Sequence, residues 1–320
     1  MVLQEFNLQR ETPFSKDVLF RAARYLNQCG PKIRDLFWFG GCWVATTLEE
    51  TDSKAVPRRI AGSPVYFKSA AEDPEPDPAA LKRKAPQGLD YDNTDYLSES
   101  NTLLRPGIML ASSLIKGNKN GQTKDEWKST TSGIMVANDK GEIFITVATH
   151  GFENDGLVYH PNPLTGRVIG RVVDVLPGTG ISIVKLESGL EYLNETFGTA
   201  ENPAGDTLSG LAPGFAPHTR TYDMLSMNNP FSGSCDGLIL GVGLRLEGSN
   251  ANYVLHEWLL LDNGEKAPID GSCGSPVLDN QAGVVGLFRF KKNENNQCIC
   301  VAATELRNFN YEICGGRHRF

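Results

Sequence analysis

The sequence predicts an all-β protein preceded by a helical appendage, and three observations support this. From residue 105 onward, short β-rich runs follow one another between turns, without helix-period segments among them. The chain holds 33 glycines and 18 prolines among 320 residues, a mild excess that indicates many turns. Hydrophobic residues make up 40% of the chain, which is enough to bury a core.

Residues 1–50 are expected to form a helical and apolar appendage. Apolar side chains recur on one helical face between residues 14 and 26, and Ser15 stands in the N-cap position. Asn27-Gln28 and then Gly30-Pro31 end this helix. Residues 33–46 are rich in Phe and Trp, so they need a partner surface. That surface belongs either to the main domain or to a binding partner.

Residues 51–104 have the composition of a charged, proline-rich linker. Asp73-Pro74-Glu75-Pro76-Asp77-Pro78 and Lys82-Arg83-Lys84 contain no large apolar side chain. We interpret the Lys-Arg-Lys run as a solvated loop rather than a localisation signal.

The main domain is expected to span residues 105–315. Its apolar runs have the length of strands, and their spacing predicts an antiparallel sandwich or barrel. The runs are 107–111, 132–137, 141–148, 170–175, 181–186, 237–242, 284–290 and 298–302.

Charge and composition exclude several classes of function. A net charge of −7 provides no basic field for nucleic acid or acidic membranes, and no apolar stretch reaches the roughly 20 residues of a membrane span. The first residues lack a basic region followed by an apolar one, so we expect no secretory signal and a cytoplasmic location. In that compartment the seven cysteines are expected to be free thiols. No cofactor is expected, and the oligomeric state is left open.

The most informative segment is Gly271-Ser272-Cys273-Gly274-Ser275-Pro276. Glycines and small residues around one thiol let the backbone turn sharply, expose the sulfur and direct N–H groups toward a developing oxyanion. A nucleophilic thiol needs a base, and His150 follows an apolar strand in Thr146-Val147-Ala148-Thr149-His150.

These two motifs, 123 positions apart, resemble those of the trypsin/chymotrypsin-like protease superfamily. With cysteine in the nucleophile position, the chain is similar to the viral chymotrypsin-like cysteine proteases. The resemblance covers about residues 105–315 and implies two six-stranded antiparallel barrels. It also implies a protein or peptide substrate, with no metal.

Carried over to this sequence, the resemblance makes Cys273 the nucleophile and His150 the general base. The backbone N–H groups of Gly271 and Cys273 would then form the oxyanion hole. The position of the triad Asp is taken by Gly180. Three alternatives follow: a Cys-His dyad, substitution by Asp174 or Asp155, or a catalytically inactive module that binds a protein partner.

Substrate preference is weakly encoded. Ala267 occupies the floor of the primary pocket, and Phe288, Arg289 and Phe290 lie on the strand that would line the substrate. Neither a basic nor a glutamine preference is supported, which leaves a small or apolar residue before the scissile bond. A serine nucleophile at Ser272 or Ser275 is a minor alternative.

Other histidines and cysteines carry weaker signals. His160, His218 and His256 are expected to be structural or surface residues. A zinc site formed by Cys298, Cys300, Cys314 and His318 is a second possibility, although their spacing on a strand favours buried free thiols.

Overall fold

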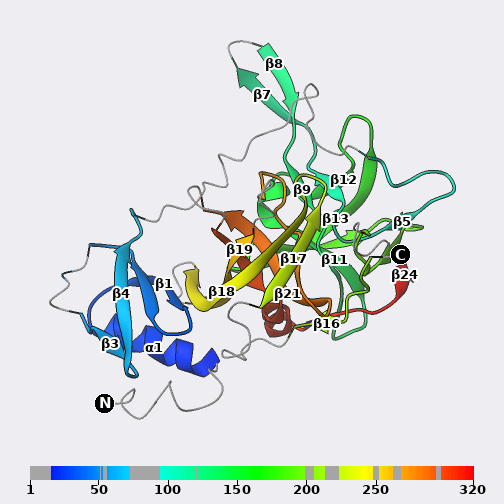
Figure 1. The fold of residues 1–320 in the computed structure, drawn as a ribbon. Coiled ribbons are helices and arrows are strands. Elements are labelled where there is room, and N and C mark those ends of the chain that lie inside the picture. Colours follow the sequence, from blue (N-terminus) through cyan, green and yellow to red (C-terminus); the bar gives the residue numbers. More distant parts are fainter. Residues whose placement is uncertain are drawn as a thin grey trace.

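The protein is mostly β, as predicted. The structure, a computed structural model, describes residues 16–50, 52, 56–72, 94–119, 122–198, 205–212, 223–247, 252–261, 268–292 and 297–320. Strands make up 51% of these described residues and helices 10%. The strands form a closed six-stranded barrel and a half-barrel. The two lie side by side in the main body, from which the β7–β8 hairpin projects (Figure 1).

The closed barrel is formed by strands from the C-terminal half of the chain. Its hydrogen-bonded order is β17-β20-β21-β22-β19-β18, and the β17–β18 pairing closes it. The short strand β16 (Gly210–Leu211) runs parallel to β21. The six bounds are β17 Met224–Asn229, β18 Gly233–Glu247, β19 Asn252–Leu261, β20 Pro276–Asp279, β21 Gly283–Lys291 and β22 Gln297–Ala302.

The half-barrel is an eight-stranded sheet of order β23-β10-β11-β14-β13-β12-β6-β9. Its bounds are β6 Met109–Ala111, β9 Ser129–Thr131, β10 Met135–Asn138, β11 Ile143–Ala148, β12 Leu157–His160, β13 Arg167–Leu176, β14 Ile181–Leu186 and β23 Tyr311–Ile313. Two smaller sheets flank it. They contain β5 Leu103–Leu104, β15 Glu191–Leu193 and β24 Arg317–Arg319, and β7 Ile115–Lys119 with β8 Gln122–Glu126. Short 3-10 helices are η3 Thr149–Gly151 and η4 Ala303–Phe309.

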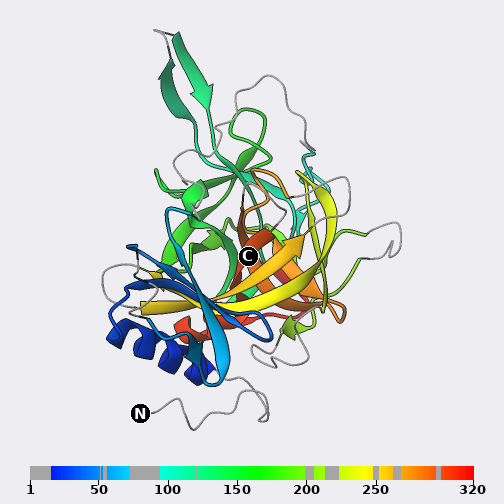
Figure 2. The ribbon, with the colours of Figure 1, turned by 60° about the vertical axis from the view of Figure 1, so that its left-hand side comes forward.

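The N-terminal unit extends the sheet of the closed barrel. Its elements are α1 Lys16–Gln28, β1 Ile33–Trp38, β2 Trp43–Thr47, β3 Arg59–Ile60 and β4 Ser63–Ser69. Strand β1 pairs with the far end of β18, from Trp38↔Val242 to Asp35↔Arg245. Figure 2 shows this blue unit against the extended yellow strand. The Phe- and Trp-rich segment therefore packs on the protein's own sheet.

Amphipathic periodicity explains the helix. The face of α1 that contacts the sheet buries Val18, Leu19, Ala22, Ala23 and Leu26 against a cluster that includes Trp43 and Leu244. Ser15, the predicted N-cap, lies outside the described residues. The Asp73–Pro78 and Lys82–Lys84 segments of the predicted linker also lie outside them.

All eight predicted apolar runs coincide with strands. The segment predicted as a linker, 51–104, also contains β3, β4 and β5, so ordered structure continues past residue 50. Strand β4 pairs in parallel with β2, which attaches the start of this segment to the N-terminal unit. The division into three domains stays a prediction.

The two barrels share an apolar core. One buried cluster joins half-barrel side chains such as Val136 and Ile183 to closed-barrel side chains such as Leu278 and Leu287. This shared packing fixes the strands that carry His150 relative to the loop that carries Cys273.

Candidate active site

Cys273 lies just before β20, in a segment that we call the Cys273 loop (residues 268–275). Its side chain is 6% exposed and belongs to a buried cluster, which we call the Cys273 cluster. This cluster also contains Ala148, two residues before His150. The thiol donates a hydrogen bond to the carbonyl oxygen of Arg289 on β21, at 3.0 Å. The sulfur is therefore buried and held by the closed barrel, so the expectation that this turn exposes the sulfur is wrong.

Glycine is required where the Cys273 loop meets the half-barrel. Gly274 has a φ of 94°, in the left-handed region that favours glycine. A Cβ at this position would lie 2.5 Å from the carbonyl oxygen of Thr131 and 3.2 Å from the nitrogen of Ala148. The missing side chain thus lets the Cys273 loop approach the strand that leads to His150.

Thr131 at the end of β9 binds two carbonyl groups of the Cys273 loop. Its hydroxyl donates to the carbonyl of Gly271 at 2.9 Å, and its backbone N–H donates to the carbonyl of Cys273 at 3.0 Å. A third carbonyl, that of Ser272, accepts from the N–H and the hydroxyl of Ser275. The loop is consequently fixed from both barrels.

The N–H groups of the Cys273 loop divide into paired and unpaired donors. The N–H groups of Ile269, Ser272 and Gly274 donate to Ser232 Oγ, the Ile269 carbonyl and the Phe288 carbonyl, at 3.1, 3.1 and 2.8 Å. Within the described part of the chain, those of Asp270, Gly271 and Cys273 donate to no oxygen. The N–H groups of Gly271 and Cys273 are the two that the resemblance assigns to the oxyanion hole, and no described oxygen competes for them.

His150 is carried by the half-barrel, in the short helix η3 that follows β11. The N–H of Thr149 donates to the carbonyl of Gly180 at 2.9 Å, which fixes the start of η3. Lys128 Nζ donates to the carbonyl of His150 at 2.9 Å. Strand β11, the β14 region and Lys128 therefore hold the backbone of His150.

Both predicted catalytic groups are neutral at pH 7. Burial lowers the pKa of His150 to about 4, and the positive charges of Lys128 and Arg289 lower it too. Burial raises the pKa of the Cys273 thiol to about 12, Asp270 adds to this effect, and the Arg289 charge opposes it. The resting pair is thus a thiol and an imidazole rather than an ion pair.

Gly180, at the position of the expected acid, adopts a φ of 69°. The place that its Cβ would take lies 3.7 Å from Nε and 3.8 Å from Cζ of Arg289. A guanidinium therefore stands where an orienting carboxylate was expected. The charge next to His150 is positive instead of negative.

The two acids considered as substitutes contact neighbouring residues. Asp174 is exposed on β13, accepts from the N–H of Val175 at 2.8 Å and forms a hydrogen bond with Tyr311 that helps to raise the pKa of that tyrosine. Asp155 accepts from the N–H of Leu157 at 3.0 Å. Both carboxylates thus have local contacts, and a role of either as the third member beside His150 stays a prediction.

The predicted substrate-binding residues have different surroundings. Ala267 lies outside the described residues. Phe288 is 3% exposed in the Cys273 cluster, and its backbone pairs with the Cys273 loop. Phe290 instead packs in a cluster with Phe37 of the N-terminal unit, beneath the Arg245 guanidinium. Arg289 Nη1 lies 3.1 Å from Nε2 of His256.

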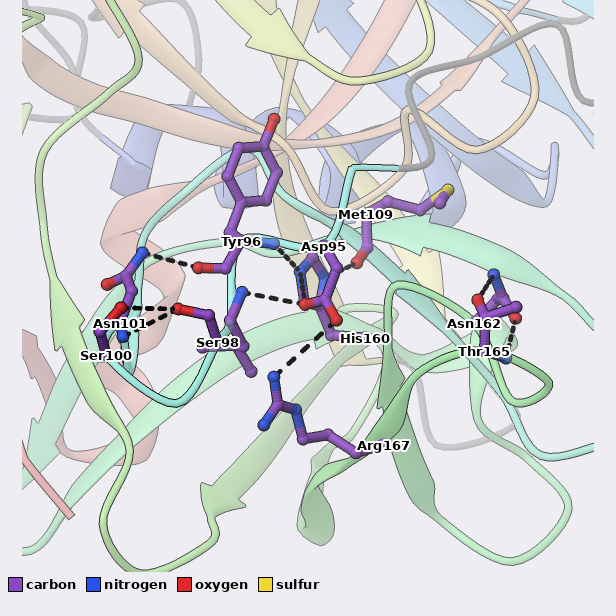
Figure 3. Close-up of polar contacts among 11 residues, drawn as sticks. Asp95, Tyr96, Ser98, Ser100, Asn101, Met109, His160, Asn162, Thr165 and Arg167 are labelled. Carbon is purple, nitrogen blue, oxygen red and sulfur yellow. Dashed lines mark hydrogen bonds and ion pairs between the residues drawn. The ribbon is translucent and has the colours of Figure 1, made fainter.

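The remaining histidines that the structure describes serve the fold. His160 is fully buried: its Nδ1 lies 2.7 Å from the Met109 carbonyl and its Nε2 accepts from the N–H of Tyr96 at 3.1 Å (Figure 3). The fully buried ring of His256 contacts the Val254 carbonyl through Nδ1, at 3.0 Å. His218 lies outside the described residues.

The four residues considered for zinc are dispersed. Cys298 and Cys300 lie in the Cys273 cluster, Cys314 packs against the half-barrel core, and His318 stands on β24 against Phe320. In the described residues no group of three His, Cys, Asp or Glu side chains is arranged to hold a metal ion. Likewise, no helix found there is long and apolar enough to cross a membrane.

Sequence reasoning did not identify Thr131 or Asn229 as residues that support the Cys273 loop. Asn229, at the end of β17, accepts a hydrogen bond from the hydroxyl of Ser272 at 3.1 Å. Both contacts join segments more than 40 residues apart, so no local motif marks them.

The chain matches no family model and no curated protein. Among solved structures it is similar to Thermobifida fusca protease A, with 14% identity, a TM-score of 0.46 and coverage of 67% of this chain and 100% of that one. It is also similar to a glutamic-acid-specific serine protease, with 13% identity, a TM-score of 0.48 and coverage of 66% of this chain and 100% of that one. A third similar structure is that of the Nocardiopsis protease, with 15% identity, a TM-score of 0.46 and coverage of 66% of this chain and 98% of that one.

Proposed function

We propose that the chain is a cysteine-type endopeptidase that cleaves peptide bonds through Cys273 and His150. The observation that carries this proposal is a thiol next to two N–H groups, those of Gly271 and Cys273, that donate to no oxygen of the described residues, on a loop whose Gly271, Ser272 and Cys273 carbonyl groups are held by hydrogen bonds. Two fixed donors beside a thiol are the arrangement that stabilises the oxyanion of acyl transfer. A protein or peptide substrate follows from this chemistry.

The reaction would begin from a neutral pair. Binding of a peptide carbonyl displaces the thiol proton from the Arg289 carbonyl, and His150 accepts it as Sγ bonds to the carbonyl carbon. The carbonyl oxygen takes the negative charge between the two N–H groups. His150 then returns the proton to the leaving nitrogen as the C–N bond breaks, which leaves a thioester. Water, deprotonated by His150, hydrolyses the thioester and restores the thiol.

The direct test is cleavage of a peptide library by the full chain. We expect Cys273→Ala to abolish cleavage, and His150→Ala to reduce it by about 100- to 10,000-fold. The matched control is Cys235→Ala, which removes another buried thiol of the same cluster and should retain cleavage. Absence of cleavage by the unmodified chain, together with alkylation of Cys273 no faster than that of the other six thiols, would refute the proposal.

A second function is favoured by one observation, the Arg289 guanidinium beside Gly180. A cation at this place opposes the imidazolium that the reaction requires, and the thiol already donates to the backbone carbonyl of Arg289. The alternative is an inactive protease-like module that binds a protein partner. It predicts that the unmodified chain and Cys273→Ala bind the same peptides with equal affinity and release them uncut.

A further inference from the structure

The turn from Asn229 to Gly233, between β17 and β18, packs directly on the Cys273 loop. Asn229 is 3% exposed, and its carboxamide oxygen accepts three hydrogen bonds. The donors are the N–H of Phe231 at 3.0 Å, the N–H of Ser232 at 2.9 Å and the hydroxyl of Ser272 at 3.1 Å. One buried oxygen therefore ties this turn to the residue that precedes Cys273.

Ser232 makes the second link between the turn and the loop. Its hydroxyl oxygen accepts from the N–H of Ile269 at 3.1 Å and lies 3.1 Å from the hydroxyl oxygen of Ser272. Because the Ser272 proton goes to Asn229, the Ser232 proton is the one shared between the two hydroxyls. The resulting chain runs from Ser232 through Ser272 to Asn229 and contains no ionisable group.

Phe231 makes the third link, through packing. A Cβ at Gly271 would lie 2.7 Å from the ring of Phe231, so the ring rests on the glycine itself. On the other side, the Thr131 hydroxyl holds the Gly271 carbonyl. Gly271, with a φ of 104°, is thus held between the turn and the half-barrel.

We propose that Asn229 is a positioning residue for the oxyanion hole. Its carboxamide oxygen fixes Ser272 and the backbone of the turn, and these hold the N–H groups of Gly271 and Cys273 in place. This inference rests on the proposed peptidase function. It implies that the hydrogen bonds that position the hole from the turn involve neutral groups only, while the charges nearest to Cys273 are those of Asp270 and Arg289.

The test compares two buried asparagines with similar structural duties. Asn194 is 1% exposed and binds the backbone of Met135 and Cys314 in the half-barrel, away from the Cys273 loop. Asn229→Ala should lower kcat for peptide cleavage about 10- to 100-fold with little change in KM, and Asn194→Ala should not. Ser272→Ala, which removes only a hydroxyl, should give a smaller loss of the same kind.

Two further measurements separate this inference from the proposed function. Alkylation of Cys273 by iodoacetamide needs no oxyanion hole, so its rate should be the same in Asn229→Ala and in the unmodified chain. Amide hydrogen exchange at Ser272 and Gly274 should become at least tenfold faster in Asn229→Ala and remain unchanged in Asn194→Ala.

If the unmodified chain cleaves nothing and Cys273 is alkylated no faster than the other six thiols, the proposed function fails, and hydrogen exchange alone decides the positioning role. Unchanged exchange in Asn229→Ala would overturn that role. So would an equal loss of kcat in Asn194→Ala, since that would report global destabilisation. If Asn229→Ala does not fold, Ser272→Ala decides by the same two readouts.

Discussion

Desolvation controls the protonation of the two central residues, His150 and Cys273. Burial is the largest influence on both groups, and it drives each toward its neutral form. The positive charge of Arg289 disfavours the imidazolium form of His150 and so adds to the effect of burial on its pKa. The same charge favours the thiolate form of Cys273 and so opposes the effect of burial there. In the proposed reaction, a proton would move from Cys273 to His150 only as the sulfur bonds to a bound carbonyl carbon, as in general-base catalysis.

The lowered pKa of His150 has a consequence for stability. An unfolded histidine titrates near 6.5, whereas folded His150 titrates near 4. Between these values the unfolded chain binds a proton that the folded chain does not. The contribution of His150 is therefore complete above pH 6.5 and is lost as the pH falls toward 4, by at most about 3 kcal/mol. Buried His256, whose pKa is also lowered, acts in the same direction.

Urea unfolding at pH 7, 5.5 and 4.5 measures this effect. We expect the free energy of unfolding to fall more steeply as the pH is lowered in the unmodified chain than in His150→Gln, which cannot take up the proton. The carboxylates titrate in both proteins, so the difference between the two curves isolates the histidine. Parallel curves would mean that folded His150 keeps an ordinary pKa.

The candidate residues divide into those that a motif predicts and those that only topology brings to the site. Cys273 and His150 were predicted because their chemistry requires glycines and a preceding strand nearby in sequence. Thr131 and Asn229 stand at the ends of strands, and the residues of the Cys273 loop that they bind lie more than 40 positions away in the sequence. The guanidinium beside Gly180 was unpredictable for the same reason.

At the scale of elements, strand β18 connects the N-terminal unit to the closed barrel. Its 15 residues pair with β17 at one end and with β1 at the other. At the β1 pairing, Asp35 faces Arg245 in register, and the two side chains form a bidentate ion pair at 2.7 and 3.1 Å. Both side chains are 2% exposed, and Asp35 also accepts a hydrogen bond from Arg34 at 3.0 Å, so the Arg245 charge depends on a carboxylate that two guanidinium groups share.

Removing one partner of this pair should destabilise the protein strongly. Asp35→Ala withdraws the carboxylate from a buried guanidinium, and we expect a loss of about 3–5 kcal/mol in the free energy of unfolding. The control is Asp17→Ala, which breaks the exposed pair with Arg21 on α1 and should change that free energy by less than about 1 kcal/mol. Chemical denaturation of both variants measures the contrast. Similar values for both would mean that the buried pair is screened as surface pairs are.

Local patterns predicted the elements better than their connections. The apolar face of α1 and all eight apolar runs were recognised because period 3.6 and short β-rich runs are local signals. Strand β4 was missed because Pro64 lies within it and its surroundings are charged. The pairing of β1 with β18 joins segments about 200 residues apart, which no window of sequence reveals.

At the scale of the whole molecule, the shared sheet argues against an independent N-terminal unit. Helix α1 and strands β1–β4 bury their apolar faces on β18, which continues into the closed barrel. The closed barrel in turn shares a core with the half-barrel. Loss of any one part exposes apolar surface of the next, which is the physical basis of cooperative unfolding.

We therefore predict a single unfolding transition. Trp127→Phe/Trp258→Phe leaves Trp38 and Trp43, both buried in the N-terminal unit, as the only tryptophans. Their fluorescence in urea should change at the same midpoint as far-UV circular dichroism, which reports both barrels, because β18 cannot lose β1 without exposing the cluster around Trp43 and Leu244. A tryptophan transition at clearly lower urea would instead show that the unit unfolds separately. The unmodified chain, followed by circular dichroism alone, is the control for the two substitutions, since an unchanged midpoint shows that they leave the sheet intact.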